Sequence, residues 1–399
     1  MVDLLRGLRT EITREKVQIL GLLIAGVFLF VCSLQGVGRG FKLVFSEWAN
    51  LFLSMIESGV APFTGLAIGV LATTILVSSS AVIATTMVSM ASMVAAGLSL
   101  SSAMRFGVPM VLGANLGTTV SNTVTLFAIR RATTQEEFNA TIPAVIVDDI
   151  FKFLTVIIFF TLEVTTGFLS TITTALGAFI YELLRLEQIF AIFEKSVIDI
   201  LIEEPIIKPL ERIFSTWFGA QLGGLFFFIL WFALVVVSID LLITKGLNKL
   251  IETDWADRLS AALDSPFKSF TTGFFITWLV GSSSVGTSLI IPMVATKIVN
   301  LKKAYPYICG CALGTTLDLA QIYGYMAGGV VSIMLGLTHV LFNVFGLTLW
   351  LVSPLRIVPP RIANAAGRFI ASSPHSTLLL IAYAIGTFVL LPLMVILIF

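Results

Sequence analysis

Long, nearly uninterrupted apolar stretches are the feature that most constrains the fold of this chain. Runs of 18 or more predominantly apolar residues recur along its length, for example at 17–34, 222–243 and 376–399. A helix of that length can cross the hydrocarbon core of a bilayer. The composition agrees, because only 12% of the residues are charged, against roughly a quarter in a typical soluble domain. The sequence therefore predicts an all-α polytopic membrane protein.

Charge and cysteine content argue against several other classes of function. The net charge of +1 gives no basic surface for nucleic acid. Cys32, Cys309 and Cys311 are too few and too irregularly spaced for a disulfide framework or a zinc site. The first residues lack the short apolar core and cleavage site of a signal peptide. Basic residues between positions 6 and 16 precede the first apolar run, which predicts a cytoplasmic N-terminus.

A run of three serines interrupts an apolar segment at two places in the chain. Residues 75–90 read ILVSSSAVIATTMVSM, and residues 278–293 read WLVGSSSVGTSLIIPM. A second matching pair follows, with GANLGTT at 113–119 and GCALGTT at 310–316. Internal repeats of this kind in a membrane protein are typical of secondary transporters.

The basic residues in the flanking loops predict how the two repeats are oriented. In the first repeat, Arg105 precedes the GANLGTT segment, and Arg130 and Arg131 follow it. In the second repeat, three lysines between 297 and 303 precede the GCALGTT segment, and no basic residue follows it around 324–329. Short cytoplasmic loops collect Lys and Arg, so the reversed bias predicts inverted topology.

The pattern divides the chain into six predicted regions. They are an N-terminal cytoplasmic segment with a first span or interfacial helix (1–58), the first repeat (59–165), a hydrophilic connector on the extracellular side (166–221), a span with a charged loop (222–264), the second repeat (265–368) and a C-terminal span (369–399). Each repeat is predicted to contain a re-entrant helical hairpin and a discontinuous helix. Hydroxyls and glycines inside an apolar segment favour this arrangement, because broken helices are tolerated at membrane depth only inside protein or beside a watery cavity.

The serine runs have a functional and a structural interpretation. A hairpin tip near the middle of the bilayer would expose the N–H groups and partial positive charge of a helix N-terminus, which attract anions. Serine hydroxyls donate protons to an anion or offer lone pairs to a small cation. Two facing tips would then form one site for an anion together with Na⁺. The alternative is close helix packing through small residues, but the duplication favours a functional site.

The paired motifs resemble those of the type II sodium-dependent phosphate cotransporters. In that family each repeat has a Gln-Ser-Ser-Ser element followed by a Gly-(Ala/Ser)-Asn-Ile-Gly-Thr-Thr-like element. The segment IPAVIVDDIFKFLTVIIFFTLE resembles the family's segment centred on His-Asp-Phe-Phe-Asn. The similarity covers about 59–165 and 265–368. The resemblance implies a multi-pass transporter in the plasma membrane that couples uptake of inorganic phosphate to Na⁺ by alternating access. It further implies a homodimer, with no cofactor besides Na⁺ as the coupling ion.

The residues, the resemblance and the departures from it together predict two sets of binding residues. The substrate-binding set is Ser78, Ser79, Ser80, Ser282, Ser283, Ser284, Thr118, Thr119, Thr315 and Thr316. The Na⁺-binding set is Asn115, Asn122, Asp318, Thr74 and Thr287.

Three positions depart from the family pattern. The two glutamines that precede the serine runs are replaced by Val77 and Gly281, and the second-repeat asparagine is Ala312. Asp318 stands two residues after the second Gly-Thr-Thr. A bare carboxylate at mid-bilayer costs about 2.5–3.5 kcal/mol, so it persists there only when it is paired, protonated or bound to a cation. We therefore expect Asp318 to supply a Na⁺ ligand or a proton site that replaces the lost amides. The alternative is that Asp318 faces water at a helix end.

Further polar residues lie inside apolar segments. Asp149 and Lys152 are three positions apart and are predicted to pair on one helix face, either as an internal ion pair or in coupling. Asp148 precedes them. Asp148 and Lys152 stand where the resembling segment has His and Asn.

His339 and Asn343 are predicted to share a helix face, with His339 as a hydrogen-bonded packing residue. Gln321 and Tyr323 are predicted to line the same cavity as Asp318.

Other functions remain open from the sequence. The same fold would also suit another small anion, or coupling to protons through Asp318. A passive channel and a membrane enzyme are more remote alternatives. The chain contains only two histidines, His339 and His375, and no evident Ser–His–Asp set or metal-ligand cluster. We therefore expect that the protein is not an enzyme.

Overall fold

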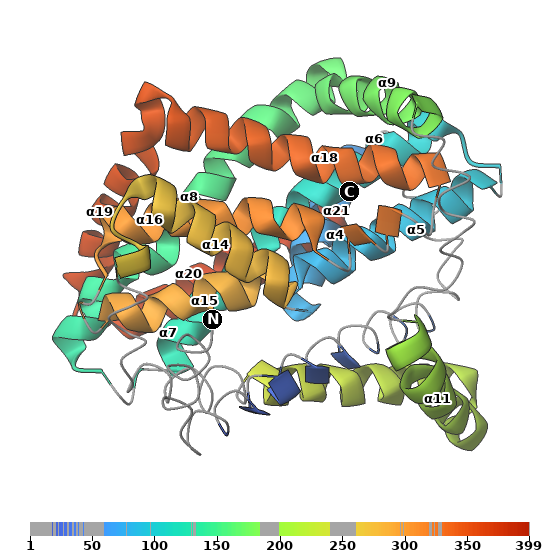
Figure 1. Ribbon diagram of the computed structural model, residues 1–399, viewed down its shortest axis with the longest axis horizontal. Coiled ribbons are helices and arrows are strands. Elements are labelled where there is room, and N and C mark those ends of the chain that lie inside the picture. Colours follow the sequence, from blue (N-terminus) through green and yellow to red (C-terminus); the bar gives the residue numbers. More distant parts are fainter. Residues whose placement is uncertain are drawn as a thin grey trace, which may run out of the picture.

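The structure is a computed structural model that describes residues 60–183, 199–239 and 261–398, apart from isolated positions, with scattered residues between 18 and 43. Within these residues the chain is helical and has no strand (Figure 1). Two helical stretches there are long and apolar enough to cross a membrane, at Gly329–Val352 and Ser376–Ile398. The predicted first span near 17–34 lies mostly outside the described residues.

Each serine run lies between two helices that are shorter than a membrane span. The first run separates α4 (Ala61–Leu76) from α5 (Ser79–Ala95). The second run separates α14 (Pro266–Val280) from α15 (Ser283–Ala295). In Figure 1, α4 and α5 lie to the right of centre, and α14 and α15 lie to the left.

A broken helix packs against each of these pairs. In the first half, α6 (Leu100–Gly117) packs along α4, turns at Thr118 and Thr119, and continues as α7 (Val120–Ala128). In the second half, α16 (Leu301–Gly314) packs along α14 and passes into a short 3₁₀ turn, Thr315–Leu317. Both helices are therefore interrupted at the Gly-Thr-Thr motif.

The long helices of each half cover the other half. Helix α8 (Gln135–Thr166) of the first half packs on α19 (Val358–Ala371) of the second half. Helix α18 (Gly329–Leu347) of the second half packs on α9 (Phe168–Leu183) of the first half and also contacts α5 and α6. This crossing brings side chains from the two halves together in the interior.

The connector and the C-terminal region are helical where they are described. The predicted connector 166–221 contains α9, a π-type turn at Asp199–Ile207 and the start of α11 (Lys208–Ile239), which bends at Gly219. The predicted C-terminal span 369–399 contains α20 (Ser376–Ile385), a π-type turn and α21 (Leu391–Ile398).

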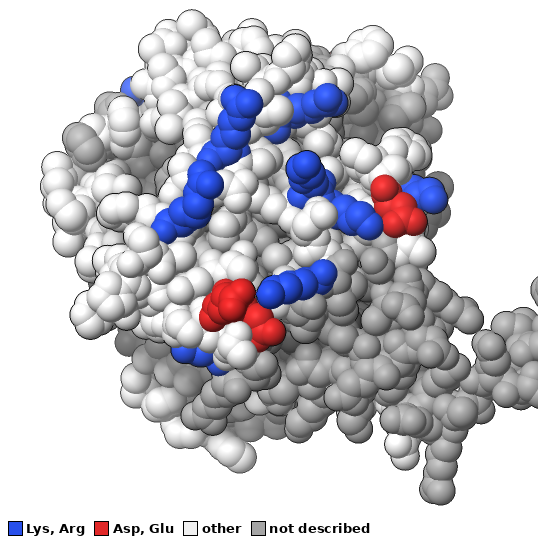
Figure 2. All heavy atoms as spheres, turned by 90° about the vertical axis from the view of Figure 1, so that its left-hand side faces the viewer, with Lys and Arg blue, Asp and Glu red and all other residues white. Residues whose placement is uncertain are grey.

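Lysine and arginine side chains gather at one end of the molecule (Figure 2). This end holds the loop between α7 and α8 and the turn between α15 and α16. Lys297 of that turn lies 3.7 Å from Glu136 at the start of α8, and Lys303 at the start of α16 lies 3.1 Å from Asp264. Helix α19 reaches the same end, where Asn139 donates a hydrogen bond to the Ala371 carbonyl oxygen.

Close approach of helices depends on glycines at equivalent places in the two halves. A Cβ atom at Gly113 of α6 would collide with the carbonyl oxygen of Leu66 in α4. A Cβ atom at Gly310 of α16 would collide with the carbonyl oxygen of Phe270 in α14. Small residues of this kind are what lets membrane helices approach closely.

We predict that Gly113→Ala and Gly310→Ala each lower the free energy of unfolding by about 1–3 kcal/mol, because a methyl group there overpacks the helix contact. Gly386→Ala is the matched control, since nothing lies within 4 Å of a Cβ atom there, and it gains helix propensity. The measurement is thermal unfolding of the purified protein in detergent. Equal changes in stability for all three substitutions would contradict the close helix contacts at Gly113 and Gly310.

Candidate functional site

The first serine of each run caps the helix that follows it. The Ala81 N–H donates to Ser78 Oγ at 3.2 Å, and the Val285 N–H donates to Ser282 Oγ at 3.3 Å. Serine is a favoured N-cap because its hydroxyl oxygen accepts from a first-turn N–H. Ser79 and Ser283 are therefore the first residues of α5 and α15. The first turn of each helix lacks intrahelical acceptors for its N–H groups.

Local sequence explains the break before the second run. Gly281 ends α14 in the left-handed conformation, with φ of 72°, and its N–H bonds to the Thr277 carbonyl oxygen. Glycine adopts this conformation without steric cost, whereas the family's glutamine at this position would be strained. Val77, at the equivalent position of the first run, lies outside the described residues.

All six serines of the two runs lie in the protein interior. None of them has more than 4% of its surface exposed. A buried hydroxyl is costly unless it finds a hydrogen-bond partner or a ligand. The two helix starts are therefore buried polar positions inside an apolar protein.

Asp318 joins the second half of the chain to the first serine run. Its side chain is fully buried, and the Ser80 hydroxyl donates a hydrogen bond to Oδ2. The Gln321 N–H donates to Oδ1 at 2.9 Å, and the Gln321 side-chain amide donates to the Ser80 carbonyl oxygen at 3.1 Å. The alternative in which Asp318 faces water is therefore wrong. Gln321 lies beside Asp318 as predicted, whereas Tyr323 lies outside the described residues.

A reciprocal contact joins α15, which follows the second serine run, to the first half. The Thr125 hydroxyl of α7 donates to the Ser288 hydroxyl of α15 at 2.7 Å. Each helix that starts at a serine run therefore touches the segment that follows the other half's Gly-Thr-Thr motif. Within the described residues no hydrogen bond joins Ser79 directly to Ser283.

The threonines of the two Gly-Thr-Thr motifs are buried, and they use their protons within their own segments. Their hydroxyls donate to backbone carbonyl oxygens three or four positions earlier, at 2.8–3.0 Å, in Thr118, Thr119, Thr315 and Thr316. A hydroxyl that already donates in this way still offers its lone pairs. In this geometry these threonines suit a cation better than an anion.

Two further predicted Na⁺ ligands lie near the hairpin breaks. Thr74 is in the last turn of α4, and its buried hydroxyl has no hydrogen-bond partner among the residues that the structure describes. Thr287 lies in the second turn of α15, and its hydroxyl is 3.5 Å from the Ser284 carbonyl oxygen. Both hydroxyl oxygens therefore remain available as acceptors.

An asparagine pair connects α6 to α18. The Asn343 side-chain amide donates to Asn115 Oδ1 at 3.2 Å and to the His339 carbonyl oxygen at 2.9 Å. His339 is fully buried, but neither of its ring nitrogens has a hydrogen-bond partner within the described residues. The prediction of a hydrogen-bonded packing histidine is therefore wrong, because Asn343 bonds to its backbone rather than to its ring.

The buried lysine of α8 pairs differently from the prediction. Lys152 Nζ lies 3.3 Å from Asp148 Oδ2, one helical turn away, and the Asn122 amide lies 3.4 Å from the same oxygen. Asp149 instead accepts a hydrogen bond from the Tyr383 hydroxyl at 2.8 Å. The predicted Asp149–Lys152 pair is wrong, because successive residues on a helix point about 100° apart and only Asp148 is turned toward the lysine.

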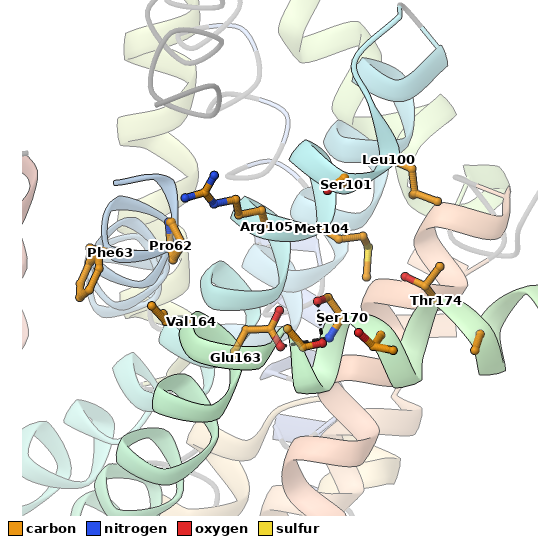
Figure 3. A pocket seen from close by; sticks show the side chains of 13 residues that line it. Pro62, Phe63, Leu100, Ser101, Met104, Arg105, Glu163, Val164, Ser170 and Thr174 are labelled. Carbon is orange, nitrogen blue, oxygen red and sulfur yellow. Dashed lines mark hydrogen bonds between the residues drawn. The ribbon is translucent and has the colours of Figure 1, made fainter. Parts of the chain in front are cut away.

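A separate pocket, which the sequence did not predict, lies where the start of α4 and α6 meet the α8–α9 junction (Figure 3). Its volume is about 670 Å³, and Arg105 and Glu163 are among its lining residues. The Glu163 carboxylate accepts hydrogen bonds from the Leu169 and Ser170 N–H groups at 2.7 and 3.1 Å, so it caps α9. None of the serine-run residues lines this pocket.

Comparison with known proteins assigns the family. A family model described as Na⁺/Pi-cotransporter matches residues 29–187 and 234–372, which is most of the chain. The chain belongs to the Na⁺/Pi-cotransporter family. It is therefore a membrane protein, in agreement with the two long apolar helices. No solved structure matches the chain.

Relatives in this family are named as sodium-dependent transport proteins. The chain is 27% identical to sheep sodium-dependent phosphate transport protein 2A, over 98% of this chain and 69% of that protein. It is 26% identical to the rat 2A protein, over 94% and 66%, and 25% identical to human sodium-dependent phosphate transport protein 2B, over 94% and 64%. The chain thus spans about two thirds of the length of these relatives.

We predict that Ser80 and Asp318 are energetically coupled. Ser80→Ala removes a donor from a buried carboxylate and lowers the free energy of unfolding by about 1–3 kcal/mol. In a double-mutant cycle with Asp318→Asn, thermal unfolding gives a coupling energy of about 0.5–3 kcal/mol. Ser79→Ala is the control and adds independently to Asp318→Asn. A zero coupling energy for the Ser80 pair would show that the contact does not form.

Proposed function

We propose that this protein is a secondary active transporter that couples uptake of inorganic phosphate to Na⁺ across the plasma membrane by alternating access. The observation that carries the proposal is the pair of buried helix starts at the serine runs, each in contact with the other half of the chain. Such a site lies between the two halves of the chain, where alternating access by movement of one repeat against the other requires it. The family and the names of the relatives support the same function.

In this proposal phosphate binds at the N-termini of α5 and α15. First-turn N–H groups and the helix dipole attract the anion, and the hydroxyls of Ser79, Ser283 and Ser284 donate to its oxygens. The Ser80 hydroxyl donates to Asp318 and places that carboxylate beside the anion site. Ser78 and Ser282 position the two helix starts as caps. The stretches 75–90 and 278–293 contain no Lys or Arg. The negative charge of phosphate must therefore be balanced by cations that bind with it.

Na⁺ binds in the same region through oxygen ligands. Asp318 supplies the charged oxygen, and Asn115, Asn122, Thr74 and Thr287 supply neutral ones. Thr118, Thr119, Thr315 and Thr316 belong with the cation, because their protons are used within their own segments. A carboxylate next to Ser80 links an occupied Na⁺ site to the phosphate site, which gives co-binding a physical basis.

We propose inverted repeats with re-entrant hairpins. The hairpin arms have between 13 and 17 residues, so each is about 20–26 Å long, less than the roughly 30 Å of the hydrocarbon core. The α6–α7 helix ends at the basic end of the molecule, where α16 begins (Figure 2). Basic loops mark the cytoplasmic side, so the pocket near Arg105 faces outward. The connector is then extracellular, the N-terminus is cytoplasmic, and two copies form a dimer as the resemblance implies.

A second candidate is coupling to protons, or transport of another small anion, in the same fold. The buried contact between Ser80 and Asp318 favours this variant, because a carboxylate buried in an apolar protein can take up either a proton or a cation. A passive channel lacks the gradient coupling that the relatives' names imply, and an enzyme disagrees with transport proteins as relatives.

We predict that the protein reconstituted in liposomes takes up labelled phosphate under an inward Na⁺ gradient, and that uptake falls at least tenfold in both Ser79→Ala and Ser283→Ala. Each substitution removes a donor to the bound anion, worth about 1.4 kcal/mol or more for a charge-assisted hydrogen bond. Ser99→Ala, at an exposed helix cap, is the control. Phosphate uptake that does not need a Na⁺ or proton gradient would instead indicate a channel.

We predict that Asp318→Asn changes how phosphate uptake depends on the Na⁺ concentration. The neutral amide keeps the size of the side chain but removes its charge, so half-maximal activation needs at least tenfold more Na⁺. The measurement is the Na⁺ dependence of phosphate uptake at constant pH. Unchanged Na⁺ dependence in Asp318→Asn would exclude a role for this carboxylate in coupling.

A further inference from the structure

A buried lysine in α8 stands out among the charged residues of the interior. Lys152 has only 2% of its surface exposed, and its partner Asp148 is fully buried. The pair belongs to neither the serine runs nor the Gly-Thr-Thr motifs. Burying an ion pair in an apolar interior is expensive and adds little net stability over apolar residues of the same size. Its presence therefore calls for a functional explanation.

The oxygen atoms around the pair are not all satisfied. Asp148 Oδ2 meets the lysine and the Asn122 amide, but Asp148 Oδ1 and Asn122 Oδ1 are buried without any hydrogen-bond partner in the described residues. Asp149 is also fully buried, and it accepts a hydrogen bond from the Tyr383 hydroxyl. Carboxylate and amide oxygens are the hard ligands that alkali and alkaline-earth cations prefer.

Charge balance shows what the lysine does at this place. Two buried carboxylates, Asp148 and Asp149, are accompanied by one ammonium group. Without the ammonium, the Asp148 carboxylate and the nearby Asn122 oxygen would draw in a mobile cation, because uncompensated charge is costly there. The Lys152 ammonium lies 3.3 Å from Asp148 Oδ2 and supplies a positive charge beside this carboxylate.

We propose that Lys152 is a built-in cation, whose ammonium takes a place that Na⁺ would otherwise fill beside Asp148 and Asn122. The protein then binds one Na⁺ fewer than it would with a neutral residue at position 152. This inference rests on the proposed Na⁺-coupled function and adds to it a residue that sets the number of coupling ions. The resembling segment has His and Asn at these two positions, so the Asp148–Lys152 pair is a departure from it.

The Asp148–Lys152 pair also lies at a place from which a change in cation binding can be transmitted to neighbouring helices. Asn122 follows the break in the α6–α7 helix, and α8 packs against α7, α15 and α18. The helix that carries the pair therefore packs against elements of both halves.

The test counts Na⁺ bound per chain in purified detergent-solubilised protein, using radioactive Na⁺ without phosphate. Lys152→Met removes the ammonium and keeps an unbranched apolar chain as long as the lysine's aliphatic stem. We expect Lys152→Met to bind one more Na⁺ than the wild type. The double variant Asp148→Asn/Lys152→Met, which removes both charges, is expected to bind the wild-type number. Equal numbers in all three folded proteins would overturn the proposal.

A second measurement covers the case in which Lys152→Met is unstable without Na⁺. Its unfolding temperature should rise more steeply with the logarithm of Na⁺ concentration than that of the wild type, because Na⁺ binds the folded state. Lys208→Met is the control, because Lys208 is an exposed lysine that also pairs with a carboxylate four residues earlier, Glu204, at 2.6 Å. The unfolding temperature of Lys208→Met should depend on Na⁺ concentration as that of the wild type does. Equal slopes for Lys152→Met and Lys208→Met would identify a purely structural ion pair.

The outcomes separate this inference from the proposed function. Neither assay contains phosphate, so an extra Na⁺ in Lys152→Met supports the built-in cation whatever the transported substrate is. Absence of Na⁺-driven phosphate uptake by the wild type would reject the proposed function and leave the Na⁺ count intact.

Discussion

Helix ends buried inside an apolar protein are the constraint on which the rest of this structure depends. A helix that starts in the interior exposes N–H groups that water cannot reach, so side chains or ligands must satisfy them. Ser78 and Ser282 each accept one of these N–H groups, which leaves the rest of the first turn available. The Gly-Thr-Thr breaks solve the opposite problem, because their hydroxyls donate to carbonyl oxygens of the same segment. Backbone N–H donors therefore lie at the helix starts beside the serine runs, and oxygen acceptors lie at the helix ends beside the Gly-Thr-Thr motifs.

Buried carboxylates provide the second level of organisation. Asp318 is held by Ser80 and Gln321, so the negative charge lies against a helix start of the opposite half. Asp148 is held by Lys152 and Asn122. The first carboxylate accepts hydrogen bonds from a serine hydroxyl and a backbone N–H, whereas the second has a resident ammonium group beside it. In the proposed function this difference separates a position that a mobile ion must fill from one that the chain fills itself.

The helical class and the places where helices break could be predicted from the sequence, because both depend on local chemistry. Apolar runs dictate helices, and a serine run or a Gly-Thr-Thr motif inside such a run marks a helix end, as at Ser79 and Gly117. The proximity of Gln321 to Asp318 was also predictable, since the two are three residues apart.

Contacts between distant parts of the chain could not be predicted in the same way. Ser80 and Asp318 are 238 residues apart, and only the crossing of the two halves brings them together. The predicted partner of Lys152 is wrong because residues three and four positions away both lie on its helix face, and tertiary packing decides which of them pairs with it. For the same reason no local pattern showed that the ring of His339 would lack a partner or that a pocket would form beside Glu163.

The most direct test of the proposed binding site is a structure determined by electron cryomicroscopy with Na⁺ and phosphate present. We predict density for a tetrahedral anion at the N-termini of α5 and α15, within hydrogen-bond distance of the serine runs, with Na⁺ beside Asp318. Density for the anion elsewhere, for example in the pocket near Arg105 with the serine runs unoccupied, would contradict it.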